Sequence, residues 1–147
     1  GFDFGLANET VGDFRGFGLG LVNTVGGDMH GVQWSPVGYA RIDGNVQGWQ
    51  GALVSHTVGH FQGLQGSIVT LTDRDFSGVQ LGVFYTRTRG AMSGWQMGLV
   101  NEAGSMSGLQ LGLVNLAGDM NGLQIGLFNQ IRSKERLKVF PIVNWKF

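Results

Sequence analysis

Three histidines and a few carboxylates are the residues of this 147-residue chain that could bind a metal ion. His56 and His60 flank a predicted turn, and Asp73 and Asp75 lie one sequence repeat further on. Imidazole nitrogens and carboxylate oxygens are common zinc ligands, so a site formed by these four side chains is conceivable. Two solvated loop histidines explain the same pattern more simply. We therefore predict no metal ligand in this chain.

The acidic residues do not suggest paired-carboxylate catalysis, because most lie in predicted turns, where aspartate bonds to nearby backbone groups. These residues are Asp13, Asp28, Asp43, Asp73, Asp75 and Asp119. The chain has no nucleophile elbow. Its glycines recur in every predicted strand, so matches to G-x-G patterns carry no phosphate-loop meaning. We predict no catalytic residue and no cofactor, and hence a protein that is not an enzyme.

The basic residues fall into two groups that could form rims at the ends of a barrel. The first is Arg74, Arg87 and Arg89, and the second is Arg132, Lys134, Arg136 and Lys138. We favour a simpler interpretation, in which these are solvated charges that keep the loops in water.

Seven glutamines recur at one position of a repeat and are the best candidates for a specific role. They are Gln33, Gln50, Gln65, Gln80, Gln96, Gln110 and Gln124. If they are buried, their amides must bond to one another or to water. The row therefore lines a narrow wet pore or forms a closed polar ladder that fixes register, and we favour the ladder.

The repeat that carries these glutamines organises the whole chain. Nine units, spaced ~14 to ~17 residues apart, align on one glycine each. These glycines are Gly1, Gly16, Gly31, Gly48, Gly63, Gly78, Gly94, Gly108 and Gly122. Within a unit, apolar and small or polar residues alternate, as in Leu109-Gln110-Leu111, which predicts β-strands and no helix. Asparagine closes several strands, for example Asn101 and Asn115, with Ser55, Thr70 and Tyr85 at the equivalent place.

The centre of the repeat, Gly108 to Gly112, reads the same in both directions around Gln110. The segment Asn115 to Gly118 has the composition of a type I turn followed by a left-handed glycine. A hairpin with Ala117 at its tip would pair Gln110 with Gln124, Leu109 with Ile125 and Leu111 with Leu123. Mirror-symmetric strands suit an antiparallel meander. A parallel β-solenoid also stacks like residues but does not need the symmetry, so it is the alternative.

The chain ends in one further alternating stretch, Leu137 to Phe147, with Pro36 marking a bulge or an edge earlier in the sequence. Nine repeat strands and this one make ten. We predict a single all-β domain over residues 1–147, an antiparallel up-and-down meander that closes into a β-barrel of about ten strands. The leucines face lipid if they point outward, and form a soluble core if they point inward.

Composition limits the possible partners. The formal net charge is zero and only 14% of residues are charged, so nothing attracts nucleic acid. There is no cysteine, which is compatible with an oxidising compartment, and no apolar run long enough for a membrane helix. The chain begins abruptly in strand-like residues, so we expect that a signal peptide has been removed.

Lipid is the environment that we favour for the leucines. Alternating segments joined by tight turns match the signature of transmembrane barrels, although the apolar stretch from Leu109 to Leu113 is shorter than the usual band. Val143, Trp145 and Phe147 resemble the C-terminal signal by which outer-membrane barrels are recognised for assembly. The tryptophans mark a membrane interface or are large core residues; they are Trp34, Trp49, Trp95 and Trp145.

The repeated phrase GLQLGLVN and the ending VFPIVNWKF resemble the surface-repeat proteins of Gram-negative bacterial envelopes, most closely from Ser93 to Phe147. The resemblance implies export to the envelope and carries over no catalytic residue. We expect a structural or narrow pore-like barrel of the outer membrane or cell surface, with membrane lipid and other envelope proteins as partners. The alternative is an exported soluble β-solenoid that acts as a binding or adhesive scaffold.

Overall fold

The computed structural model describes residues 1–147 and contains nine strands that form one sheet. The strands are β1 (Phe2–Thr10), β2 (Phe14–Val25), β3 (Met29–Ile42), β4 (Val46–Thr57), β5 (Phe61–Thr72), β6 (Phe76–Met97), β7 (Val100–Leu111), β8 (Val114–Ile131) and β9 (Val139–Lys146). Each strand pairs only with its neighbours in the sequence. The prediction of an all-β repeat protein is confirmed.

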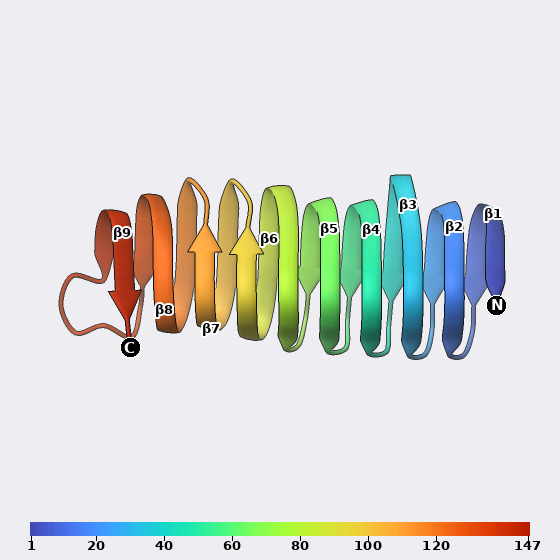
Figure 1. Cartoon of the computed structure of the whole chain (residues 1–147), viewed down its shortest axis with the longest axis horizontal. Helices are drawn as coiled ribbons and strands as arrows, with labels where there is room; N and C mark the ends of the chain where they lie inside the picture. Colours follow the sequence, from blue (N-terminus) through green and yellow to red (C-terminus); the bar gives the residue numbers. More distant parts are fainter.

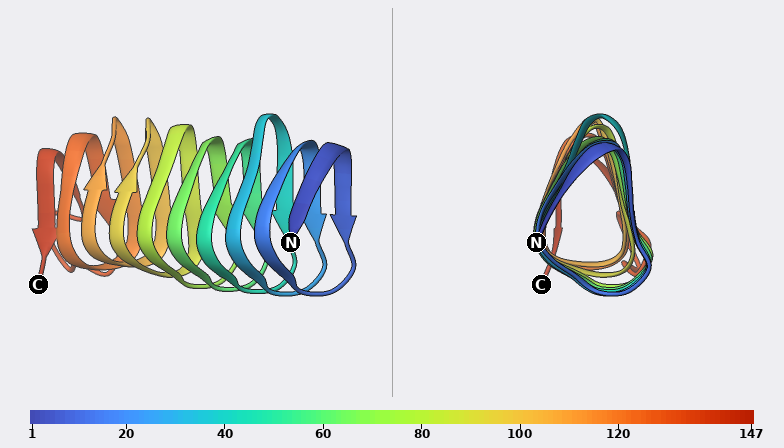
Figure 2. Two further views of the ribbon diagram at one scale, coloured as in Figure 1. Left: turned by 45° about the vertical axis from the view of Figure 1, so that its right-hand side comes forward. Right: turned by 90° about the vertical axis from the view of Figure 1, so that its right-hand side faces the viewer.

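Every pair from β1 to β8 is parallel, and only β8 and β9 are antiparallel. The chain winds as a coil whose turns lie side by side (Figure 1), and the turns superimpose on a rounded triangle when viewed along the coil (Figure 2). Each residue pairs with its equivalent one turn later, as Phe2 does with Phe17 and Gly108 with Gly122. This is a parallel β-solenoid. The predicted antiparallel ten-strand barrel is wrong, and the alternative is confirmed.

The mirror symmetry of the repeat misled the barrel prediction, because Gln110 lies opposite Gln124 in either arrangement. The hairpin would have placed Leu109 opposite Ile125, whereas Leu109 lies opposite Leu123. The segment predicted as a hairpin turn instead continues as strand β8, and its first asparagine, Asn115, is fully buried. A buried asparagine needs hydrogen-bond partners inside the protein, and the parallel coil supplies them.

The glycine that opens each repeat forms a corner of the coil. At eight of these glycines, from Gly16 to Gly122, φ lies between 125° and 151°, a conformation that side chains disfavour. A Cβ at Gly108 would lie 2.1 Å from the carbonyl oxygen of Gly94. The repeat therefore requires glycine both for the backbone angle and for the close approach of neighbouring turns.

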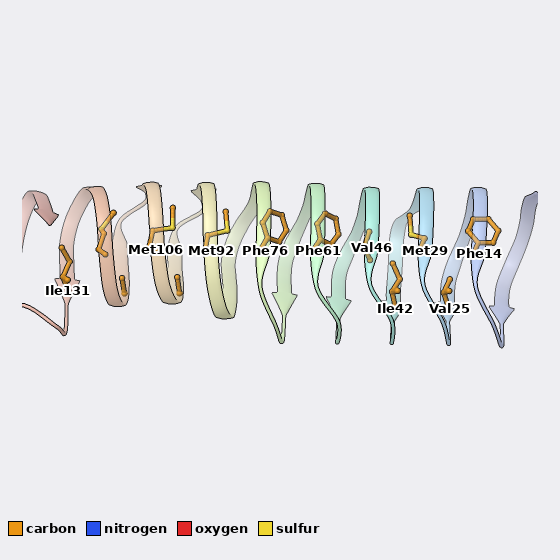
Figure 3. Close-up of a cluster of buried hydrophobic side chains, with 13 residues drawn as sticks. Phe14, Val25, Met29, Ile42, Val46, Phe61, Phe76, Met92, Met106 and Ile131 are labelled. Atoms are coloured by element: carbon orange, nitrogen blue, oxygen red, sulfur yellow. The ribbon is translucent and has the colours of Figure 1, made fainter. Parts of the chain in front are cut away.

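A column of apolar side chains runs along the inside of the coil (Figure 3). Phe14, Met29, Val46, Phe61, Phe76, Met92, Met106 and Met120 occupy one position of successive turns, and each is at most 7% exposed. The rings of Phe61 and Phe76 stack with centroids 4.7 Å apart. This column packs against a second one that contains Val25, Ile42, Ala103, Ala117 and Ile131.

Extra residues in the longer turns are accommodated in bulges. The register shifts between Leu19 and Val22 in the β2–β3 pair, and between Ser35 and Tyr39 in the β3–β4 pair. Both shifts involve the segment of β3 that contains Pro36. The turn formed by β3 stands above its neighbours (Figure 1). The predicted bulge at Pro36 is confirmed, and it leaves the glutamine and glycine positions in register.

The antiparallel strand β9 covers the last turn. Its Asn144 is buried opposite Gln124, while Val143 and Trp145 point outward opposite Ile125 and Leu123. Lys146 Nζ donates to Asp119 Oδ1 at 2.6 Å and joins the end of this strand to the preceding turn. The structure has no helix of the length and hydrophobicity that would cross a membrane.

We expect Gly108→Ala to lower the free energy of unfolding by about 2–4 kcal/mol, because it combines a disfavoured φ with a backbone clash. The matched control is Gly66→Ala, since no atom lies within 4 Å of a Cβ built there. That control should be neutral or stabilising by up to about 1 kcal/mol. Urea unfolding followed by circular dichroism measures both. Equal losses in the two variants would contradict this account of the corner.

The Asp119–Lys146 contact should make stability depend on pH. The Lys146 ammonium, followed by the Ser133 hydroxyl and the Met120 amide, lowers the pKa of Asp119 from 3.8 to about 2. The contribution is therefore present above pH 4 and is lost as the pH falls towards 2. We expect Asp119→Asn to lower Tm at pH 5, and we expect this difference from the wild type to shrink steeply as the pH falls to 2. A Tm difference that persists unchanged at pH 2 would contradict the assignment.

Candidate functional site

The structure places all seven glutamines inside the coil, where each is at most 2% exposed. The amide nitrogen of each glutamine after Gln33 donates to the amide oxygen of the glutamine one turn earlier. The distance is 2.7–2.9 Å along the five links from Gln50 to Gln124, and 3.4 Å from Gln50 to Gln33. The glutamines are thus arranged as a ladder in which the amides bond to one another.

The glutamine amides also form hydrogen bonds with other groups of their own turn. Thr57, Thr72 and Thr88 donate their hydroxyl protons to the amide oxygens of Gln50, Gln65 and Gln80. In the C-terminal turns, the amide nitrogens also donate to backbone carbonyls, as Gln96 does to Glu102 at 2.9 Å. The ladder ends at Gln124, whose Oε1 is buried without a partner. The glutamine ladder does not continue beyond Gln124, because β9 is antiparallel to β8 and places the shorter Asn144 opposite this glutamine.

A second polar ladder was missed by the sequence interpretation, which assigned its residues to turns. Asn101 Nδ2 donates to Asn115 Oδ1 at 2.8 Å, and Asn115 Nδ2 donates to Asn129 Oδ1 at 2.7 Å. In the central turns the position is held by Ser55, Thr70 and Thr86, not Tyr85. The recurrence of asparagine once in each C-terminal repeat was the available signal. It indicates stacking in a coil as well as turn chemistry.

The two ladders point in opposite directions along the coil. Glutamine nitrogens donate towards the N-terminal turns, whereas the asparagine nitrogens of Asn8, Asn101 and Asn115 donate towards the C-terminal turns. Each ladder is a chain of aligned amide dipoles, which strengthen one another within the chain.

The residues on either side of each glutamine point outward and form what we call the outer apolar face. Its first row is Phe2, Phe17, Val32, Trp49, Leu64, Val79, Trp95, Leu109, Leu123 and Trp145. Its second row is Phe4, Leu19, Trp34, Gly51, Gly66, Leu81, Met97, Leu111, Ile125 and Val143. Neither row contains a charged residue, and the leucines point outward.

All four tryptophans lie on the outer apolar face, so none is a core residue. Trp95 is 56% and Trp145 53% exposed, and the rings of Trp34 and Trp49 lie 5.9 Å apart. A hollow of about 580 Å³ lies at Gly66 and is bordered by Leu53, Leu81 and Met97. The face is therefore ridged at its tryptophans and recessed at its centre.

The proposed assembly residues at the C-terminus lie on or beside the same face. Val143 and Trp145 extend its two rows, and Phe147 is 88% exposed beyond the end of β9. A role for these three residues in envelope assembly stays a prediction. Lys134 Nζ lies 5.8 Å from the centroid of Trp145 and donates to Asn144.

The histidines and aspartates do not converge on one point. His56 Nε2 lies 2.8 Å from Asp73 Oδ2, and His60 Nδ1 lies 3.5 Å from Asp75 Oδ2. His56 belongs to strand β4, not to a loop, and its other ring nitrogen faces Tyr39 and Arg41. No cluster of three or more potential metal ligands is formed.

The expectation of solvated loop charges holds for Arg74 but not for Arg87 and Arg89, which belong to strand β6. Arg87 and Arg89 line a pocket with Arg132, which the sequence interpretation assigned to the other group.

Comparison of the chain with protein-family models, with curated proteins and with solved structures finds no match in any of the three.

We expect Gln96→Leu to lower the free energy of unfolding by about 2–4 kcal/mol, because it leaves a buried amide of Gln110 and the Glu102 carbonyl short of a partner. Gln62→Leu is the matched control, since the side chain of Gln62 is exposed on the outside of the coil. It should change stability by no more than about 0.5 kcal/mol. Urea unfolding measures both variants, and a neutral Gln96→Leu would contradict a structural role for the ladder.

Proposed function

We propose that this protein is a non-enzymatic scaffold of the bacterial envelope, which presents the outer apolar face to a second copy of itself. The observation that carries the proposal is the absence of any charge in the two rows of that face. The resemblance of the repeats to Gram-negative surface-repeat proteins supports the envelope location. The rigid coil supports the scaffold role, because each turn is bonded to the next in both its backbone and its interior.

The size of the face supports a partner. Its length along the coil is roughly 43 Å at ~4.8 Å per turn. Its two rows together are about 14 Å wide, because residues on one face of a strand repeat about every 7 Å. The resulting area of about 600 Å² is at the upper end of the largest apolar patches of monomeric proteins. Two copies face to face would bury about 1,200 Å², which reaches the range of stable specific interfaces.

The chemistry of the face supports a second copy as the partner. Two uncharged faces meet without repulsion and without the cost of burying a charge. Flat sheets pack face to face at about 10 Å, with side chains of one filling spaces in the other. A twofold axis brings the same patch of both copies together, so one surface suffices.

We expect the wild-type protein to be a dimer by analytical ultracentrifugation without detergent. Trp95→Lys should raise the dimer dissociation constant by at least about thirtyfold, since it removes a large central contact and buries a charge. Ser107→Lys is the matched control, because Ser107 is exposed two residues before Leu109 and belongs to neither row of the face. It should leave the dissociation constant unchanged. Circular dichroism checks that both variants keep the fold.

A folded wild-type monomer would overturn the dimer. If that monomer also floats with phosphatidylethanolamine–phosphatidylglycerol vesicles, and Trp95→Lys does not, lipid would be the occupant of the face. A wild-type protein that stays monomeric and does not float with vesicles would overturn the role of the face in binding.

A further inference from the structure

A polar pocket lies on the side of the coil away from the outer apolar face. Its volume is about 370 Å³. The residues that line it are Arg87, Thr88, Arg89, Glu102, Ala103, Gly104, Gly118 and Arg132. These residues come from β6, β7 and β8 and from the residue that follows β8. The parallel register brings together Arg89 and Arg132, which are far apart in the sequence.

Two glycines keep the pocket open. Arg89, Gly104, Gly118 and Arg132 occupy the same position in four successive turns. Because the two middle residues are glycines, no side chain at this position fills the space between the two arginines. A Cβ would lie 2.2 Å from the Arg89 carbonyl oxygen at Gly104, and 2.3 Å from the Gly104 carbonyl oxygen at Gly118. Close backbone packing therefore excludes any larger residue from the floor.

The arginines of the pocket have few acidic partners. Neither Arg87 nor Arg132 forms an ion pair with a carboxylate, and Arg89 lies 3.5 Å from Asp73, which His56 also engages. The Nε atom of Arg87 is buried and has no hydrogen-bond partner. An unpaired buried guanidinium N–H is costly. The charge of Arg87 is therefore not neutralised by a carboxylate bound to it.

The one carboxylate in the lining is already engaged by another group. Tyr85 donates its hydroxyl proton to Glu102 Oε2 at 2.5 Å. Burial, followed by the hydrogen bond to Glu102, raises the pKa of Tyr85, so the phenol keeps this proton at neutral pH. The lining still carries three guanidinium groups against one carboxylate.

We propose that this pocket binds a small oxyanion, a molecule that carries phosphate or carboxylate groups. Guanidinium groups suit such ligands because their planar N–H donors match pairs of phosphate or carboxylate oxygens. The pocket volume is within the range of small-molecule sites. The pocket lies on the side of the coil away from the outer apolar face, so it stays accessible when that face is covered.

Isothermal titration calorimetry with inorganic phosphate and with succinate, at constant ionic strength, tests the proposal. We expect saturable one-site binding of at least one of the two. The stronger ligand then tells phosphate from carboxylate. Arg132→Gln should weaken this binding at least about tenfold, since it removes a charged hydrogen-bond donor from the lining. Arg136→Gln is the matched control, because Arg136 does not line the pocket, and it should bind as the wild type does.

Glu102→Gln gives a second test that loss of folding cannot imitate. Removing the one negative charge in the lining should strengthen anion binding, by about threefold or more at moderate ionic strength. Absence of saturable binding of either anion to the wild type would overturn the proposal. Equal weakening by Arg132→Gln and Arg136→Gln would also overturn it, because binding would then reflect general surface charge. These readouts do not depend on the oligomeric state.

Discussion

The in-register stacking of buried amides is the constraint on which the rest of the molecule depends. A glutamine displaced by one residue would leave its amide unpaired in the interior, at a cost of about 1–3 kcal/mol. Each turn must therefore place its glutamine at the same point of the perimeter. The corner glycine, two residues before it, allows neighbouring turns to approach closely enough. Turns of different lengths satisfy this constraint because the bulges near Pro36 and Gly90 accommodate the extra residues elsewhere.

Much of the architecture could be predicted from the sequence, because the repeat shows which residues are equivalent. The alignment on Gly16, Gly31 and their successors is the register of the sheet. The direction of the strands could not be predicted from the same pattern, since a repeat symmetric about Gln110 satisfies both directions at its centre. The two strand directions differ in what they require of the residues at the ends of the repeat. Asn115 is compatible with a solvated turn and with a buried ladder, and only its neighbours in space distinguish the two.

The candidate sites were less accessible to sequence reasoning. The alternation around Gln110 indicates two faces, and it could not say which one points outward. Glutamine can lie inside the coil because its amide bonds to its copies in neighbouring turns. An apolar residue can also lie there, as Phe61 and Met92 do. The pocket formed by Arg87, Arg89 and Arg132 depends on register between distant segments and on glycines whose role is to leave space. Neither property is visible as a motif.

The opposite directions of the two amide ladders have a consequence for how the coil can grow. A single ladder of aligned amides would accumulate a dipole with every added turn, as the peptide groups of a helix do. Here each C-terminal turn contributes one glutamine amide and one asparagine amide whose dipoles oppose each other. The partial charges that the two ladders place at each end of the rod then offset one another. Duplication or deletion of a whole repeat leaves the ends of the molecule electrically unchanged, so length is a property that this architecture can vary at little cost.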